Sequence, residues 1–246
     1  MNFDIVIKDE NSYQEFLTFL KSISKAETIE DHERHVAIIN TKQEVICISM
    51  ANIRKIAKTI SKTSAEKFLN ISQAKDYKDQ IFEETLIEGI VIAQLKNVND
   101  QIERFKKWVY KIDNWATCDS VVSSLKILKN KPSEEFYGFF RDLCFSAHEF
   151  VSRFGIVVLM TIYLNAAHID DILDICRLVK SEQFYVNMAL AWLLSYTYVK
   201  FKEKTTNLFK EKCLSKFVQN KAISKCRDSF RVSKEDKEVL KGYRVK

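Results

Sequence analysis

Glycine and proline are scarce in this chain, and their scarcity restricts the folds that it can adopt. Only 4 of its 246 residues are glycine and only 1 is proline. β-Sandwiches, β-barrels and Rossmann-like folds need these residues at their many turns, whereas packed helices need few of them. Hydrophobic residues make up 46% of the chain, enough for a sizeable core. The sequence therefore predicts an all-α protein without a glycine-rich phosphate loop.

Helical periodicity covers nearly the whole chain and recurs at a regular interval. It predicts helices near residues 11–24, 49–61, 79–95, 98–110, 115–130, 133–145, 148–165, 168–180, 183–201, 204–214, 216–229 and 234–244. The first helix of each later pair begins near 79, 115, 148, 183 and 216, a spacing of 33 to 36 residues. Such a period is typical of stacked helical repeats. We therefore predict a curved solenoid of HEAT-like antiparallel helix pairs, an α-α superhelix.

The predicted pairs belong to one domain, because a single pair buries too little surface to be stable alone. We expect this domain to span residues 1–246, with the least periodic stretch, 25–43, forming an irregular connection. The first helices of the later pairs, such as 150–164 and 185–199, are apolar nearly all round. They should pack between two neighbours and line the concave face of the solenoid.

Charge is distributed unevenly along the chain. Residues 200–246 hold 15 Lys/Arg and 6 Asp/Glu, whereas residues 1–199 carry a small net negative charge. A basic C-terminal portion of this kind fits a polyanionic partner, either nucleic acid or an acidic membrane surface. A solvated lysine-rich face explains the same charge equally well.

Several classes of protein are disfavoured by what the sequence lacks. No uncharged apolar run reaches the roughly 18 residues of a transmembrane helix, and the first residues do not resemble a signal peptide. The six cysteines are dispersed, as is typical of reduced thiols in a cytoplasmic protein. His32 and His35 lack further His or Cys ligands nearby, so we expect no metal site.

One short motif suggests a ligand site. Trp115 and Asp119 are four residues apart, so on a helix they share a face. An indole face and a carboxylate both attract positive charge, and the pair would suit a cationic ligand. A packed indole beside a solvated acid is the alternative. Arg153 and Trp192 follow at roughly one repeat each, and we expect all four to converge in the groove.

The order of these residues resembles that of the AlkD-like DNA alkylation-repair glycosylases, over roughly residues 45–232. The features that carry the resemblance are Asp-x-Trp-x-x-x-Asp at 113–119, Arg153 at the start of an apolar helix, Glu-x-Phe at 182–184 and Ala-x-x-Trp at 189–192. The resemblance implies a curved stack of HEAT-like pairs that excises cationic N3- and N7-alkylated purines from duplex DNA.

The resemblance also implies roles for individual residues. Asp119 matches the catalytic aspartate, Trp115 and Trp192 match the two indoles that flank the lesion deoxyribose, and Arg153 matches a basic residue near the DNA backbone. An alkylated purine is already cationic, so its departure needs no general acid. A carboxylate and two indoles would stabilise the oxocarbenium-like sugar that remains.

In this hypothesis the partner is double-stranded DNA containing alkylated bases, bound without cofactor, metal or membrane. Phosphates would be held by four basic residues near the C-terminus: Lys221, Lys225, Arg227 and Arg231. We expect a monofunctional enzyme without lyase activity. It would be a monomer, located in the cytoplasm and associated with the nucleoid when bound to DNA.

Two other functions remain open from the sequence, namely a non-catalytic protein that binds damaged or branched DNA and a helical-repeat adaptor for protein partners. Simpler structural roles also compete for single residues. Trp108 is expected in the core, and Trp192 could lie there too. Asp113 would cap the helix that begins near Trp115. Two adjacent acids, Glu83 and Glu84, favour the first turn of a helix over acid–base catalysis.

Overall fold

The computed structural model describes residues 3–24, 29–125 and 132–246. Every regular element in these ranges is a helix, which confirms the all-α prediction. The chain divides into two compact units, residues 1–131 and 132–246. The single domain expected over residues 1–246 stays a prediction.

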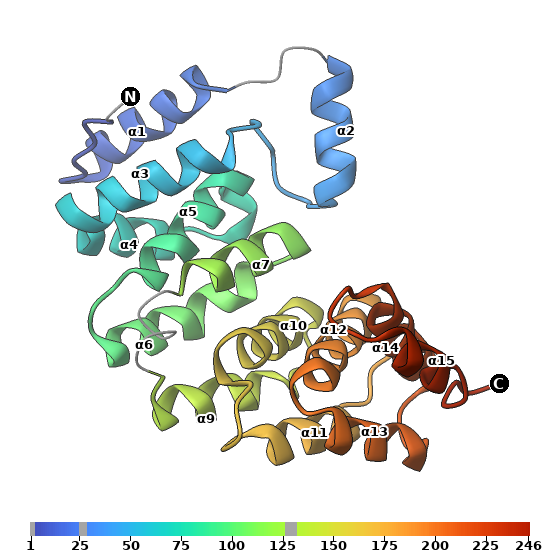
Figure 1. Ribbon diagram of the computed structural model, residues 1–246. Helices are drawn as coiled ribbons and strands as arrows, with labels where there is room; N and C mark the ends of the chain where they lie inside the picture. The colour runs from blue at the N-terminus through green and yellow to red at the C-terminus, as the bar shows by residue number, and fades with distance from the viewer. Residues whose placement is uncertain (1–2, 25–28, 126–131) are drawn as a thin grey trace. The chain divides into compact units, whose positions relative to one another are not determined.

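The first unit is built from short helices whose successive first members pack together (Figure 1). Its helices are α1 (Glu10–Ser22), α2 (Ile29–Ile39), α3 (Met50–Thr63), α4 (Ala65–Ala74), α5 (Phe82–Ala93), α6 (Val98–Trp108) and α7 (Trp115–Ser124). Helix α5 contacts α3 and α7, while α4 and α6 cover it from a second layer. Every residue of α5 is buried as a result, including its acids.

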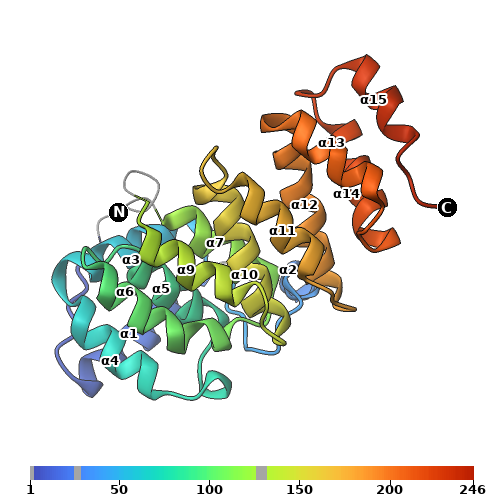
Figure 2. The same ribbon diagram turned by 90° about the horizontal axis from the view of Figure 1, so that it is seen from below.

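The second unit repeats the same arrangement (Figure 2). Its helices are α9 (Glu134–Leu143), α10 (Glu149–Val158), α11 (Ile169–Leu178), α12 (Phe184–Lys200), α13 (Lys202–Glu211), α14 (Lys216–Asp228) and α15 (Lys234–Lys241). A π-helical turn, Leu159–Tyr163, extends α10. Helices α10, α12 and α14 pack in succession, with α9 against α10, α11 and α13 against α12, and α15 against α14.

The helical repeat predicted from the sequence is confirmed. The first helices of successive pairs, α5, α7, α10, α12 and α14, begin 32 to 35 residues apart. Side-chain caps fix several helix starts, as at Asn114 and Ser215, whose side chains accept backbone N–H groups of the first turn. Within each unit, two layers of helices, with the first helices of successive pairs packed together, have the arrangement of an α-helical repeat solenoid.

Two helices were not predicted. The stretch 25–43 contains helix α2 over Ile29–Ile39, so the expected irregular connection is wrong there, while residues 25–28 lie outside the described ranges. The apolar residues of α2 are clustered in its last turn and most of its surface is exposed, which explains its weak periodicity. Helix α4 was missed as well. The helix predicted to reach residue 130 ends at Ser124, and residues 126–131 lie outside the described ranges.

We expect replacement of Gly89 by alanine to destabilise the first unit. A Cβ atom at Gly89 on α5 would lie 2.2 Å from Cζ2 of Trp108 and 2.6 Å from Cγ2 of Val121, both in the core. Overpacking of this kind costs about 1–3 kcal/mol. Urea unfolding measures the loss. The matched control is Gly138→Ala on α9, where a Cβ meets nothing within 4 Å and the helix gains about 0.5–1 kcal/mol. Equal stability of the two variants would contradict this account.

Candidate active site and DNA interface

The start of helix α7 is fixed by a hydrogen-bonded loop. Asn114 caps the helix, and its Oδ1 accepts the backbone N–H of Thr117 at 2.8 Å. Asp113, which was expected to be the cap, instead accepts hydrogen bonds from the Thr41 hydroxyl at 2.8 Å, from the backbone N–H of Lys42 at 2.7 Å and from the Tyr77 hydroxyl. Burial and this carboxylate together raise the pKa of Tyr77. The loop thereby sets the position of the next residue, Trp115.

Trp115 and Asp119 lie one turn apart on α7, and both side chains are partly exposed. The indole Nε1 of Trp115 donates to the backbone carbonyl of Ile38 at 3.0 Å, so the last turn of α2 holds the ring. Arg54 on α3 reaches the following turn of α7, with its Nη2 3.5 Å from Oγ of Ser123. One face of α7 therefore combines an indole, a carboxylate and a neighbouring guanidinium. Arg54 was not predicted as a site residue, although it lies on the polar face of a predicted helix.

The acids at the start of α5 are structural. Glu83 and Glu84 do lie in the first turn, as predicted, but both are buried. Glu83 accepts the backbone N–H groups of Ile46 and Ile48 at 3.1 to 3.3 Å, and burial raises its pKa. Glu84 accepts a hydrogen bond from Lys75 at 2.8 Å. Glu83 thereby ties the connection before α3 to the core, whereas Glu84 binds the residue that ends α4.

A buried ion pair supports the turn that leads towards α7. Glu88, whose side chain is 0% exposed, accepts hydrogen bonds from Nζ of Lys111 at 3.1 Å and from Nε2 of Gln80 at 3.0 Å. Nζ of Lys111 also donates to the carbonyl of Ser72 at 2.8 Å. Trp108 is buried beside this network, as predicted, and its indole donates to the carbonyl of Thr85 at 2.9 Å.

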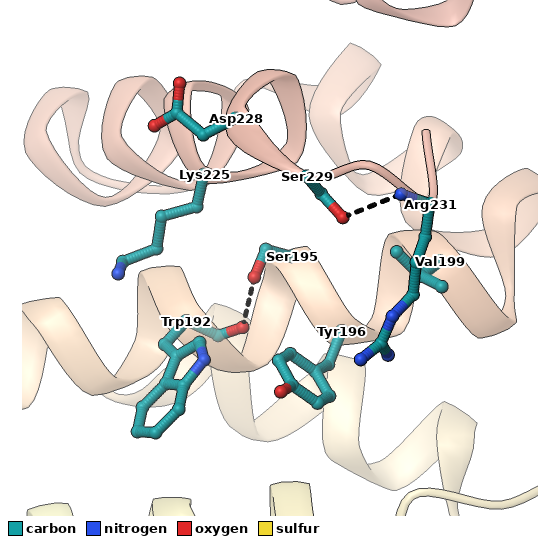
Figure 3. A pocket seen from close by; sticks show the side chains of 8 residues that line it. All are labelled: Trp192, Ser195, Tyr196, Val199, Lys225, Asp228, Ser229 and Arg231. Atoms are coloured by element: carbon teal, nitrogen blue, oxygen red, sulfur yellow. Dashed lines mark hydrogen bonds between the residues drawn. The ribbon is translucent and has the colours of Figure 1, made fainter. Parts of the chain in front are cut away.

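In the second unit, aromatic and basic side chains line a pocket of about 310 Å³ between α12 and α14 (Figure 3). Its lining residues are Trp192, Ser195, Tyr196, Val199, Lys225, Asp228, Ser229 and Arg231. Nζ of Lys225 lies 5.9 Å from the ring centroid of Trp192, and the guanidinium of Arg231 lies 5.5 Å from that of Tyr196. Trp192 is thus a partly exposed pocket residue and does not belong to the core.

The electrostatics of this pocket favour an anion. Burial, Lys221 and Arg153, in that order of effect, lower the pKa of Lys225. Arg231 adds an exposed guanidinium at the same pocket. Several cations close together repel one another, and an anionic ligand relieves this repulsion. Tyr196 was not predicted as a site residue, although its position four residues after Trp192 places both on one face of α12.

Arg153 and Arg227, two of the basic residues predicted to bind DNA, do not line the pocket. Arg153 is only 6% exposed, and its Nη1 donates to the carbonyl of Tyr185 at 3.2 Å. It therefore contributes positive potential from within the fold. Arg227 lies two residues from Lys225 on α14 and so points to nearly the opposite side. On that side, Glu238 of α15 has a lowered pKa, mainly because of Lys241 and to a smaller extent because of Arg227.

The structure thus brings Trp192, Lys225 and Arg231 together, with Lys221 and Arg153 nearby, but does not bring Arg227 to the pocket. Trp115 and Asp119 belong to the first unit. Among the described residues, no helix is both long and apolar enough to cross a membrane. The same residues contain no group of three or more His, Cys, Asp or Glu side chains suited to a metal ion.

A helical-repeat fold with a basic and aromatic pocket suits a protein that binds a polyanion. Comparison with protein families identifies which one. The family model described as DNA alkylation repair enzyme matches residues 16–225, and the chain belongs to this family. This confirms the resemblance noted in the sequence and makes DNA the partner. Comparisons with curated proteins and with solved structures found no match.

Proposed function

We propose that this protein is a monofunctional DNA glycosylase that hydrolyses the N-glycosidic bond of cationic N3- and N7-alkylated purines in duplex DNA. The observation that carries the proposal is the Trp115–Asp119 pair on one face of α7, both partly exposed in a protein of DNA alkylation repair. The capped start of α7 and the hydrogen bond from the indole to Ile38 hold the pair in place before substrate arrives. Preorganised groups of this kind lower a barrier most effectively.

The proposed reaction needs little from the protein beyond electrostatics. The bond between C1′ of the deoxyribose and the purine nitrogen breaks, and its electron pair neutralises the cationic base, which leaves. Positive charge passes to the sugar, where the carboxylate of Asp119 and the indole of Trp115 stabilise it. A water molecule then attacks C1′ and loses a proton, leaving an abasic site and a free alkylated base. Asp119 is placed to orient that water.

The pocket on α12 and α14 would hold the DNA backbone. Lys225 and Arg231 rest against Trp192 and Tyr196 in the free protein. In the proposed complex the Lys225 and Arg231 side chains bind phosphates instead, which uncovers the face of Trp192 for contact with the DNA. A lysine side chain is flexible enough for this movement. Lys221 and Arg153 add to the positive potential, while Arg227 is left out of this set.

We expect Lys225→Gln to weaken binding of undamaged duplex DNA and to reduce its salt dependence. Each lost phosphate contact makes the slope of log affinity against log salt shallower by about one. A salt titration by fluorescence anisotropy measures both effects. Lys210→Gln, an exposed position on α13, is the matched control. If Lys225→Gln and the native protein had the same slope of log affinity against log salt, Lys225 would not contact DNA phosphate.

The same pocket supports a second candidate function, a non-catalytic protein that binds damaged or branched DNA. That function needs Lys225 and Arg231 but does not need Asp119. Release of free base from alkylated duplex DNA separates the two, because only the glycosylase produces it. The glycosylase proposal also expects Trp115→Ala and Trp192→Ala to lower the excision rate. DNA binding without excision would favour the second candidate.

A further inference from the structure

A row of aromatic rings, two partly exposed and two exposed, marks the amino ends of α10, α12 and α14. Ring centroids are 4.9 Å apart for Phe150 and Tyr185, 5.3 Å for Tyr185 and Phe184, and 6.0 Å for Phe184 and Phe217. Phe184 is 56% exposed and Phe217 is 42% exposed. Large aromatic side chains exposed together mark interaction surfaces. The proposed excision reaction does not involve Phe184 or Phe217.

A groove of about 540 Å³ lies beside Phe217 on α14. Its lining residues are Lys216, Phe217, Asn220, Lys221, Ser224 and Arg244, which include three cations and no carboxylate. Asn220 fixes the chain after α15, because its Nδ2 donates to the carbonyl of Val245 at 2.8 Å and its Oδ1 accepts the N–H of Val245 at 2.9 Å. This pair of hydrogen bonds holds Arg244 at the groove.

Proteins bind unpaired nucleic acid strands with exposed aromatic side chains that lie beside Lys and Arg. Each base can stack on an aromatic face, while Lys and Arg pair with the phosphates between the bases. A duplex offers no unpaired base for such stacking. A basic protein partner would be repelled by the three cations of the groove.

We propose that Phe184 and Phe217, with Lys216 and Arg244 beside them, form a binding site for unpaired DNA. The bases stack on the two rings, and the cations hold the backbone along the amino ends of α12 and α14. This site goes beyond the proposed glycosylase, whose substrate is duplex DNA. It would let the protein bind DNA that is locally opened.

The test is fluorescence anisotropy of the full-length protein with a labelled oligothymidine of roughly ten nucleotides. We expect Phe217→Ala to weaken binding roughly 5- to 100-fold, the effect of losing one stacked base. Phe217→Leu should weaken it similarly, because leucine keeps the apolar contact but has no π face. Arg244→Gln should weaken binding and make its salt dependence shallower. Phe230→Ala is the matched control, since Phe230 is fully exposed and lies beyond the carboxyl end of α14, whereas Phe217 is at its amino end.

Two results would overturn this site. One is native affinity of Phe217→Leu for the oligonucleotide, because the groove would then bind by apolar contact alone. The other is a native protein with no affinity for unpaired DNA. Excision from alkylated duplex DNA is measured in parallel, and we expect Phe217→Ala to cut at the native rate. Native protein that binds the oligonucleotide but excises nothing would contradict the glycosylase alone and leave this site standing.

Discussion

Replacement of Asp119 by asparagine is expected to lower the single-turnover rate of base excision roughly 10²- to 10³-fold. Asparagine has nearly the same shape as aspartate, so helix α7 and its cap at Asn114 should be unaffected. What it lacks is the negative charge that stabilises the oxocarbenium-like sugar. The effect should appear in the chemical step, with the affinity for undamaged duplex DNA close to that of the native protein. Single-turnover kinetics on methylated duplex DNA measure it.

Asp142→Asn on α9 is the control for this substitution, because the side chain of Asp142 is largely exposed in the second unit. It should cut at the native rate. Arg54→Gln is informative in addition, since Arg54 borders the same face of α7 and is expected to affect binding more than chemistry. Native excision by Asp119→Asn would exclude Asp119 as the electrostatic catalyst.

Replacement of Lys111 by methionine is expected to lower the free energy of unfolding by about 3–5 kcal/mol. Lys111 is the cation paired with Glu88, and both side chains are buried, with 9% and 0% of their surfaces exposed. Removing the lysine leaves a buried carboxyl group without its charge partner and takes away one of the donors to the carbonyl of Ser72, which keeps its hydrogen bond from Nε2 of Gln80. Urea unfolding measures the loss, and Lys107→Met, at an exposed position on α6, is the control.

The same variant should show a characteristic pH dependence. Burial raises the pKa of Glu88 above its ordinary value of 4.5, while Lys111 lowers it. Without Lys111 the pKa of Glu88 rises further, so the folded variant holds a proton that the unfolded chain releases. Its stability should therefore fall as the pH rises above the ordinary glutamate value. Adding Glu88→Gln should recover part of the loss and abolish this pH dependence. Stability of Lys111→Met equal to that of Lys107→Met would show that the pair contributes little.

The helices could be predicted where local sequence signals are strong. The starts of α7 and α14 follow capping side chains, Asn114 and Ser215. Helices α10 and α12 have no side-chain cap and follow instead from their long apolar runs. Helix α2 could not be predicted in this way, because most of its surface is exposed and its apolar residues are adjacent to one another.

In the candidate site, features set by neighbouring residues could be predicted, and contacts between distant residues could not. Trp115 and Asp119 share a face through helix geometry alone, so their spacing sufficed. The contact between Arg231 and Tyr196 joins the turn after α14 to α12, and buried Arg153 donates to a carbonyl 32 residues later in the chain. Glu83 likewise finds its partners 35 to 37 residues earlier in the chain. Long side chains such as these reach several neighbours, and the fold decides which one they meet.

The most direct test of the glycosylase proposal is to identify the products released by the native protein from methylated duplex DNA. Mass spectrometry of the small-molecule fraction distinguishes a free alkylated base from a base that stays in the strand. The proposal predicts free 7-methylguanine and 3-methyladenine, with an abasic site left for each. Alkylated bases that remain attached to DNA, under conditions where the protein binds it, would contradict the proposal.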